Sequence, residues 1–321
     1  MITDTIKQFP SQFAYEPVIE NKDKLERSDL YIIAGMGGSA LPADIMKPYF
    51  NRDIIIHRGY DLPHVSDALL ARSIVIAVSY SGNTEETVSA LEAAHAKGLR
   101  VVVIASGGKL IELARTYGAP YVEIPRTGIQ PRHALGFMLK ALASVMQDEA
   151  LERDITALAG SLDATSYEAQ GKELASLVYG KIPVVYASDA NSAVAYNWKI
   201  KCNESAKVPA CVNVLSELNH NEMTGFDVIP ETKALSEKFH FIFLSDTHDH
   251  PRIVKRMELT KKLYEDRGLP ATTVALRGDS PWQRIFSSLI TADWMAYHLS
   301  TRYGTEPELV PMVEEFKKMM E

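Results

Sequence analysis

The segment DLYIIAGMGGSA, residues 29–40, joins an apolar run to a cluster of glycines and decides the class of fold. Its first part is short, β-branched and apolar throughout, which predicts a strand buried on both faces, as in a parallel sheet. The glycines follow directly, and the helical pattern of residues 39–50 begins behind them. Such a loop lets the backbone approach a ligand, and the free N–H groups of the helix start attract an anion.

The alternation of apolar runs and helical patterns continues along the chain. In the first half these segments occupy residues 53–58, 73–79, 84–97, 100–105, 109–117, 120–124 and 132–151. In the second half they occupy residues 182–187, 192–205, 209–214, 240–245, 251–267, 271–276, 281–303 and 307–320. The alternation predicts an α/β protein with two similar domains, each a doubly wound, mainly parallel sheet flanked by helices. We place the first domain at residues 1–151 and the second domain, with the C-terminal helix, at residues 152–321.

Length and composition agree with two globular domains and argue against several classes of function. The 321 residues suffice for about two domains. The net charge of −7 argues against a nucleic-acid partner or an anionic membrane surface, although a local loop can still bind phosphate. We find no signal peptide, and no apolar run reaches the ~20 residues of a membrane span. Cys202 and Cys211 are expected to be free thiols, which indicates a cytoplasmic protein.

The glycine loop by itself fits three interpretations. Gly35, Gly37 and Ala40 match the dinucleotide fingerprint G-x-G-x-x-G/A, which would make the chain an NADP-dependent oxidoreductase. That fingerprint requires an acid near the end of the second strand, where this chain has Arg58, a residue suited to a 2′-phosphate. The loop could also bind a phosphate ester, or the glycines could serve only to make a tight turn.

A second loop favours a phosphate ester. SYSGNTEET, residues 79–87, again joins an apolar strand to a helix and supplies the hydroxyls of Ser79, Ser81 and Thr84 around Gly82. A helix cap needs one hydroxyl, whereas three hydroxyls around a glycine form a cradle that donates to several phosphate oxygens. We therefore expect substrate phosphate to bind these hydroxyls together with the first loop, where Gly38 and Ser39 lie.

The two loops together resemble the sugar isomerase (SIS) domain family, which binds phosphosugars. Three further blocks are similar to the bifunctional phosphoglucose/phosphomannose isomerases: PRHALGF at 131–137, WKIKCNESAKVPA at 198–210 and ELNHNEMTGF at 217–226. The resemblance covers nearly the whole chain. It implies reversible isomerisation of glucose 6-phosphate, and also of mannose 6-phosphate, to fructose 6-phosphate through a cis-enediolate. It further implies a homodimer that needs neither metal nor cofactor.

The resemblance also implies the roles of particular residues. Glu204 corresponds to the family's proton carrier between carbon 1 and carbon 2, and Arg132 to the arginine that faces the developing negative charge. His220 corresponds to the histidine that opens the sugar ring, and in the family's dimer it enters the neighbouring subunit's site. Glu217 and Glu222 flank His220 and are candidates for positioning it, with Glu222 the alternative base.

The C-terminal helix carries the last expected catalytic residue. Lys317, rather than Lys318, matches a lysine that the family places near its active site, although a basic residue also suits a helix C-terminus. The family is expected to have a small hydroxyl residue about two turns earlier, where it makes room for mannose. This chain has Val310 or Pro311 there, which questions the second activity.

Two other interpretations complete the set. Asp246, His248, Asp249 and His250 follow a strand and could suggest a metal site, but their spacing fits a solvated loop better, and we expect no metal. A non-catalytic phosphosugar-binding protein, such as a regulator, would keep the phosphate loops. Such a protein would have no need to retain both Glu204 and the imidazole at residue 220.

Overall fold

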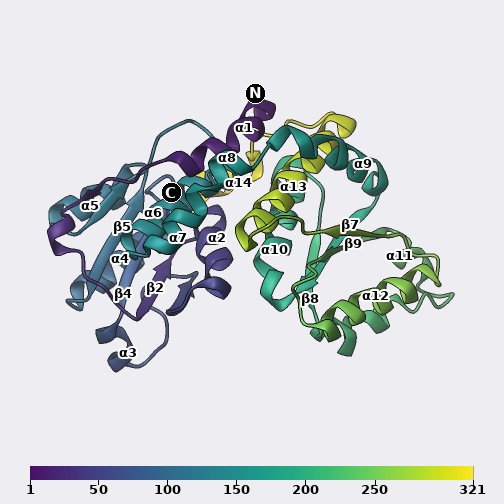
Figure 1. The fold of residues 1–321 in the computed structure, drawn as a ribbon, viewed down its shortest axis with the longest axis horizontal. Coiled ribbons are helices and arrows are strands. Elements are labelled where there is room, and N and C mark those ends of the chain that lie inside the picture. The colour runs from purple at the N-terminus through teal and green to yellow at the C-terminus, as the bar shows by residue number, and fades with distance from the viewer. Residues whose placement is uncertain (321) are drawn as a thin grey trace. The chain divides into compact units, whose positions relative to one another are not determined.

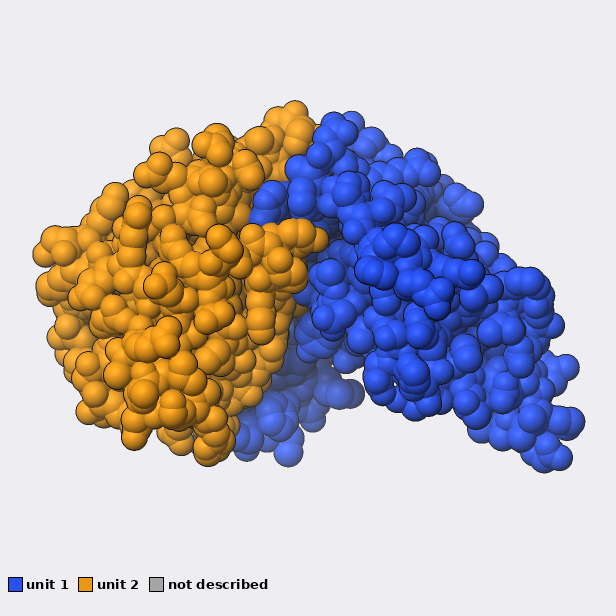
Figure 2. Space-filling model, turned by 60° about the horizontal axis from the view of Figure 1, so that its bottom comes forward, with its two compact units in different colours: residues 1–7, 162–321 blue, residues 8–161 orange. Residues whose placement is uncertain are grey.

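The computed structural model describes residues 1–320, and contacts divide the chain into two compact units (Figures 1 and 2). Unit 2, orange in Figure 2, is Gln8–Ser161. Unit 1, blue in Figure 2, comprises Met1–Lys7 and the chain from Leu162 onward. The domain boundary expected after residue 151 lies inside helix α7 (Glu149–Thr156), whereas the contacts divide the chain one short helix later, after α8 (Leu158–Ser161).

Unit 2 contains a six-stranded sheet in the order β1-β6-β5-β4-β2-β3. Its strands are β1 (Ile19–Glu20), β2 (Leu30–Ala34), β3 (Asp53–His57), β4 (Ile74–Ser79), β5 (Arg100–Ala105) and β6 (Tyr121–Glu123). All neighbouring strands are parallel except β1, a two-residue strand that pairs antiparallel with β6 and was not expected from the sequence. The other five are the apolar runs of the first half, so the predicted parallel α/β layer is confirmed here.

Both faces of this sheet are covered. Its helices are α2 (Gly37–Met46), α3 (Asp67–Arg72), α4 (Glu85–Ala96), α5 (Gly108–Tyr117), α6 (Leu135–Val145), α7 and α8. One core cluster joins Val75 and Val103 of the sheet to Leu91 of α4 and Leu110 of α5. Ile76, next to Val75 in the same strand, faces the opposite way and is equally buried. A strand without an exposed face needs a continuous apolar run, which is the pattern that predicted it.

Unit 1 repeats part of this arrangement. Its sheet has the order β10-β9-β7-β8, with every pair parallel in the described chain. The strands are β7 (Ile182–Ser188), β8 (Cys211–Leu215), β9 (Phe239–Ser245) and β10 (Ala271–Ala275). This order corresponds to β5-β4-β2-β3 of unit 2, so the chain contains the same strand plan twice, as the two sets of apolar runs predicted.

The helices of unit 1 cover its sheet with large side chains. They are α1 (Ile2–Gln8), α9 (Glu168–Val178), α10 (Ser192–Lys201), α11 (Lys233–Ser236), α12 (Pro251–Glu265), α13 (Pro281–Tyr303) and α14 (Pro311–Met320). On one side Tyr264 of α12 packs with Tyr186 and Phe241 of the strands. Elsewhere α10 contacts β7 and α13, and it contributes the fully buried Trp198. None of the helices in residues 1–320 combines the length and apolar character needed to cross a membrane.

Candidate functional site

The glycine loop of unit 2 is shaped by close backbone packing. A Cβ added to Gly38 would lie 3.0 Å from the backbone nitrogen of Arg132, and one added to Gly35 would lie 2.9 Å from the carbonyl oxygen of Val78. Gly37, at the start of α2, has a φ of 47°, a region that favours glycine. The tight-turn interpretation is therefore correct as far as it goes. Residue 38 has no room for a side chain, because the segment that carries Arg132 lies directly against it.

The serine and threonine hydroxyls of the second loop form one cluster. Ser79 Oγ lies 2.8 Å from Thr84 Oγ1 and 3.4 Å from Ser81 Oγ. Ser39 Oγ joins the two loops because it accepts a hydrogen bond of 3.0 Å from the backbone N–H of Tyr80. The structure thus brings together in unit 2 the residues expected to bind phosphate, from the ends of the neighbouring strands β2 and β4.

Thr84 does not act as a helix cap. It occupies the N-cap position of α4, yet its side chain makes no capping hydrogen bond to the described helix and lies against Ser79 instead. Two acids, Glu85 and Glu86, stand in the first turn and favour the helix start electrostatically. The hydroxyl of Thr84 is therefore turned toward the hydroxyl of Ser79 and away from the backbone of its own helix.

Gly82 holds the hydroxyl loop against its neighbour. Its φ is 74°, and an added Cβ would lie 1.7 Å from the carbonyl oxygen of Gly107. The N–H of Gly82 donates to Ser79 Oγ over 3.2 Å, and Asn83 Oδ1 accepts from the N–H of Lys109 over 2.9 Å. The loop between β5 and α5 therefore packs against the loop that carries the hydroxyl cluster and restricts its conformation. The sequence pattern of hydroxyls did not predict this contact.

Arg132 is buried next to the glycine loop, with its backbone nitrogen close to Gly38. It lies in the 3-10 turn Pro131–His133 before α6 and is 1% exposed. Gln12 fixes this turn: its Nε2 donates to the carbonyl of His133 over 2.6 Å, and its Oε1 accepts from the N–H of Gly136 over 3.0 Å. An added Cβ at Gly136 would lie 2.7 Å from the Cβ of Gln12, which explains the glycine of PRHALGF. Gln12 was missed from the sequence, because nothing local marks a glutamine that bonds across more than a hundred residues.

Glu204 lies in an unusual helical turn of unit 1. The helix expected over residues 192–205 ends as α-helix at Lys201, and a π-helical turn, Cys202–Ala206, carries Glu204. Lys207 closes the turn with a φ of 59°, and its Nζ donates to the carbonyl oxygen of Glu204. Asn203 Oδ1 accepts from the N–H of Ala210 over 3.1 Å. Short π-helical turns inside helices occur frequently at functional sites.

A buried ion pair lies immediately before this turn. Lys201 Nζ is 2.5 Å from Asp293 Oδ1 of α13, and the two side chains are 1% and 5% exposed. Burying two charges is costly unless they are paired, so removing either partner would destabilise the region strongly. This pair was not expected from the sequence. A lysine inside the otherwise apolar face of WKIK was the available signal.

His220 follows two residues that anchor its turn to the rest of unit 1. It ends the 3-10 turn Glu217–His220, in which Leu218 is fully buried. Asn219 Nδ2 donates to Thr260 Oγ1 over 2.8 Å. The imidazole of His220 is exposed, and no hydrogen bond to it is found within residues 1–320.

Glu204 and His220 lie beyond opposite ends of strand β8 in unit 1. Strand β8 runs parallel to β7, with Cys211 opposite Val184 and Leu215 opposite Ser188. Glu204 lies just before β8 begins, where Asn203 bonds Ala210, and His220 follows the end of the strand. A five-residue strand spans on the order of 15 Å. One copy of unit 1 therefore does not bring these two side chains to a common point.

Lys317 is exposed on α14 and forms an ion pair of 2.8 Å with Glu314, one turn earlier. Val310 precedes this helix and Pro311 begins it, so the departure from the expected hydroxyl residue stands at the helix start. Within the described residues of unit 1, no hydrogen bond links Lys317 to Glu204 or to His220.

Two competing interpretations meet specific obstacles. Arg58, which could have suited a 2′-phosphate, forms an ion pair with Asp44 of α2. Asp246, from the histidine-rich run, accepts a hydrogen bond of 3.1 Å from Arg284 Nε. Burial raises the pKa of Asp246, but hydrogen bonds from His248 and the charge of Arg284 outweigh burial and lower it. Within residues 1–320 no three histidine, cysteine or acidic side chains are grouped so that they could hold a metal ion.

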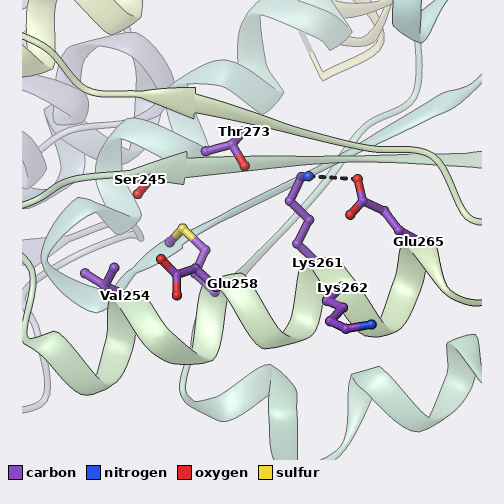
Figure 3. A pocket seen from close by; sticks show the side chains of 8 residues that line it. Ser245, Val254, Glu258, Lys261, Lys262, Glu265 and Thr273 are labelled. Atoms are coloured by element: carbon purple, nitrogen blue, oxygen red, sulfur yellow. Dashed lines mark hydrogen bonds and ion pairs between the residues drawn. The ribbon is translucent and has the colours of Figure 1, made fainter.

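Two hollows lie on unit 1, and none of the expected catalytic side chains lines either of them. The second hollow adjoins the π-helical turn that carries Glu204. The first, about 270 Å³, lies between α12 and the strands carrying Ser245 and Thr273, and Lys261 is paired there with Glu265 over 2.7 Å (Figure 3). The second, about 450 Å³, is lined by Ala206, Lys207 and the segment after α13. Both lysines that line the first hollow are paired with acids, Lys261 with Glu265 and Lys262 with Asp266, and none of the phosphate-loop residues lines it.

The comparisons with known proteins first define a class. Residues 167–320 match the bacterial phospho-glucose isomerase C-terminal SIS domain. The fold resembles the crystal structure of tagatose-6-phosphate ketose/aldose isomerase from Escherichia coli, with a TM-score of 0.69 and 16% identity over 96% of this chain and 94% of that one. The fold is thus that of SIS-domain proteins, as the two loops predicted.

Relatives with higher identity define the family within that class. The bifunctional phosphoglucose/phosphomannose isomerase of Aquifex aeolicus is 35% identical over 98% of this chain and 96% of its own length. The enzyme of the same name from Thermoplasma volcanium is 36% identical over 92% of each chain. This chain belongs to the bifunctional phosphoglucose/phosphomannose isomerase family.

Proposed function

We propose that this protein interconverts glucose 6-phosphate and fructose 6-phosphate, and mannose 6-phosphate and fructose 6-phosphate, by proton transfer through a cis-enediolate. The observation that carries the proposal is the hydroxyl cluster of unit 2. Thr84 turns away from its helix toward Ser79, and Ser39 connects the second loop to the first. Hydroxyls and helix N–H groups arranged in this way suit the three oxygens of a phosphate ester.

The chemistry then needs three further groups. His220 accepts the proton of the anomeric hydroxyl and returns a proton to the ring oxygen as the carbon 1–oxygen 5 bond breaks. Glu204 removes the proton from carbon 2 of the open aldehyde, and the electron pair moves onto the carbonyl oxygen as an enediolate. The hydroxyl proton on oxygen 2 then passes to oxygen 1, and the same carboxylic acid returns its proton to carbon 1, which leaves the ketone at carbon 2. Arg132 stays charged throughout and stabilises the enediolate oxygen electrostatically.

Lys317 completes the proposed set as a cation that approaches the substrate from the C-terminal helix. Gly38 serves by keeping the glycine loop close to the segment of Arg132, because any side chain there would push the two apart. The role of each residue follows from its motif, and its placement in one of the two units supports the role.

We further propose a homodimer in which His220 acts in the site of a second copy. The support is the separation of Glu204 and His220 across the sheet of unit 1, on the order of 15 Å along β8. A cytoplasmic location fits the two unpaired cysteines, of which Cys202 is buried.

One assay tests the proposed function. Fructose 6-phosphate formation is measured from glucose 6-phosphate and from mannose 6-phosphate, each with EDTA present, and we expect turnover of both. Binding of both sugars without turnover would refute isomerisation and leave a phosphosugar-binding protein. Turnover of glucose 6-phosphate alone would refute the second activity and point to Val310 and Pro311 as the cause.

A further inference from the structure

The segment that carries His220 is held to the core of unit 1 at several points. Leu218 is fully buried, and Arg256 Nη1 of α12 donates to Asn219 Oδ1 over 3.3 Å. At the other end Phe226 packs edge-on against Phe241, with ring centroids 4.8 Å apart. His220 and Asn221 are exposed between these attachment points, so the imidazole lies outside a firmly packed base.

Glu222 is the polar centre of this attachment. Its Oε1 accepts a hydrogen bond of 2.5 Å from the hydroxyl of Tyr186 in β7, and its Oε2 accepts one of 2.5 Å from Nδ2 of Asn213 in β8. Its backbone N–H donates to Asn221 Oδ1 over 2.5 Å. The carboxylate thus ties the two residues beside His220 to two neighbouring strands of the sheet.

The partners of Glu222 are themselves fixed. Tyr186 is fully buried, and its hydroxyl lies 3.4 Å from that of Tyr264. Burial, Tyr264 and the Glu222 carboxylate raise the pKa of Tyr186 far above its usual range, so the hydroxyl remains a donor. Asn213 cannot rotate freely, because its Oδ1 accepts from the N–H of Val214 over 2.8 Å. Both carboxylate oxygens of Glu222 are therefore committed to rigid donors.

We infer that Glu222 is a positioning residue that holds the imidazole of His220 in place for ring opening, and that it is not the base of the proton transfer. The inference rests on the ring-opening role given to His220 under the proposed function. A base must approach the substrate proton with a free oxygen. Both carboxylate oxygens of Glu222 instead accept hydrogen bonds from Tyr186 and Asn213. Positioning matters because a shift of about 1 Å in a catalytic group can lower the rate about a hundredfold.

The test measures ring opening separately from proton transfer. Interconversion of the α and β anomers of glucose 6-phosphate needs only ring opening and closing, and NMR exchange spectroscopy follows it in a Glu204→Gln background, where isomerisation is blocked. Into this background we place Glu222→Ala, His220→Ala and both together. Glu231→Ala is the matched control, because Glu231 is an exposed acid in the following loop without a described hydrogen bond in residues 1–320.

Glu222→Ala is expected to slow enzyme-catalysed anomer exchange by about ten- to a hundredfold. It is expected to cause no further loss once His220 is alanine, because it acts through that side chain. Tyr186→Phe keeps the ring and removes one donor, so it should give a smaller loss that also disappears without His220. Inhibition by 6-phosphogluconate, an open-chain acid phosphate, should be unchanged in Glu222→Ala and Tyr186→Phe, and Glu231→Ala should behave as the parent.

The outcomes separate this inference from the proposed function. Equal losses from Glu222→Ala with and without His220 would overturn the positioning role, as would weakened 6-phosphogluconate inhibition in Tyr186→Phe. An unchanged exchange rate in His220→Ala would overturn the role proposed for His220, and the inference with it. If Glu222→Ala does not fold, Tyr186→Phe decides the question alone, with thermal denaturation as the check on folding.

Discussion

Replacing both Ser79 and Thr84 by alanine tests whether the hydroxyl cluster binds phosphate or only begins a helix. Each hydroxyl would donate a charge-assisted hydrogen bond to the phosphate, worth about 1.5–3 kcal/mol. The two oxygens lie 2.8 Å apart, so they belong to one network and their losses will not add fully. A combined loss of about 2–5 kcal/mol corresponds to roughly a 30- to 4,000-fold increase in the Michaelis constant.

The assay is the Michaelis constant for glucose 6-phosphate together with competitive inhibition by inorganic phosphate. Both should weaken in the double variant, and each single variant should show an intermediate effect. Thr116→Ala is the matched control, since that exposed hydroxyl bonds only within its own helix, to the carbonyl of Glu112 over 2.9 Å. Thr84→Ala by itself should change folding stability little, because the Thr84 side chain makes no capping bond in the described chain.

The two interpretations of this loop predict opposite results. If Thr84 were simply a cap, its loss would reduce the free energy of unfolding by about 1 kcal/mol and leave substrate binding unchanged. An unchanged Michaelis constant with a lower melting temperature would therefore refute the phosphate cradle. A rise in the Michaelis constant with an unchanged melting temperature would support it.

Three further predictions follow from the site and the core. Glu204→Gln should lower turnover of every substrate by about two to four decades, whereas His220→Ala should spare substrates already in open-chain form; equal defects on cyclic and acyclic substrates would contradict this division. Activity should survive exhaustive chelation, so its complete loss and recovery with zinc would show that a metal is required. Burial and the charge of Lys181 lower the pKa of His240 to about 4, against 6.5 in the unfolded chain. The unfolded chain alone binds this proton between those values, so unfolding free energy should fall on acidification from pH 6.5 to 4, by at most ~3 kcal/mol, and His240→Gln should reduce that slope in pH-dependent denaturation.

The strands and their class could be predicted from local patterns alone. The run of residues 74–78 is apolar at every position because both faces of β4 are covered, and a strand buried on both faces favours such a continuous pattern. The same strand ends at Ser79, where the hydroxyls begin, and parallel strands place their carboxyl ends at one edge. The clustering of the two loops was therefore predictable, and so was the family, from blocks such as the one at 217–226.

Other features depended on contacts between residues far apart in the chain. Gln12 fixes the turn of Arg132, and Lys201 meets Asp293, in each case across many tens of residues. The π-helical turn at Glu204 also escaped the helical pattern, because its side chains continue the α-helical periodicity up to the point where the backbone widens.

The sequence by itself thus determined the α/β class, the duplicated strand plan and the chemical type of each site residue, since all three are properties of short segments. Only the tertiary structure decided which partners those residues contact and where they lie. It turned the Thr84 hydroxyl toward Ser79, engaged both carboxylate oxygens of Glu222 with Tyr186 and Asn213, and placed Glu204 and His220 beyond opposite ends of strand β8. The physical reason is that a hydrogen-bond partner and a strand edge are set by the packing of distant segments, which no local pattern specifies.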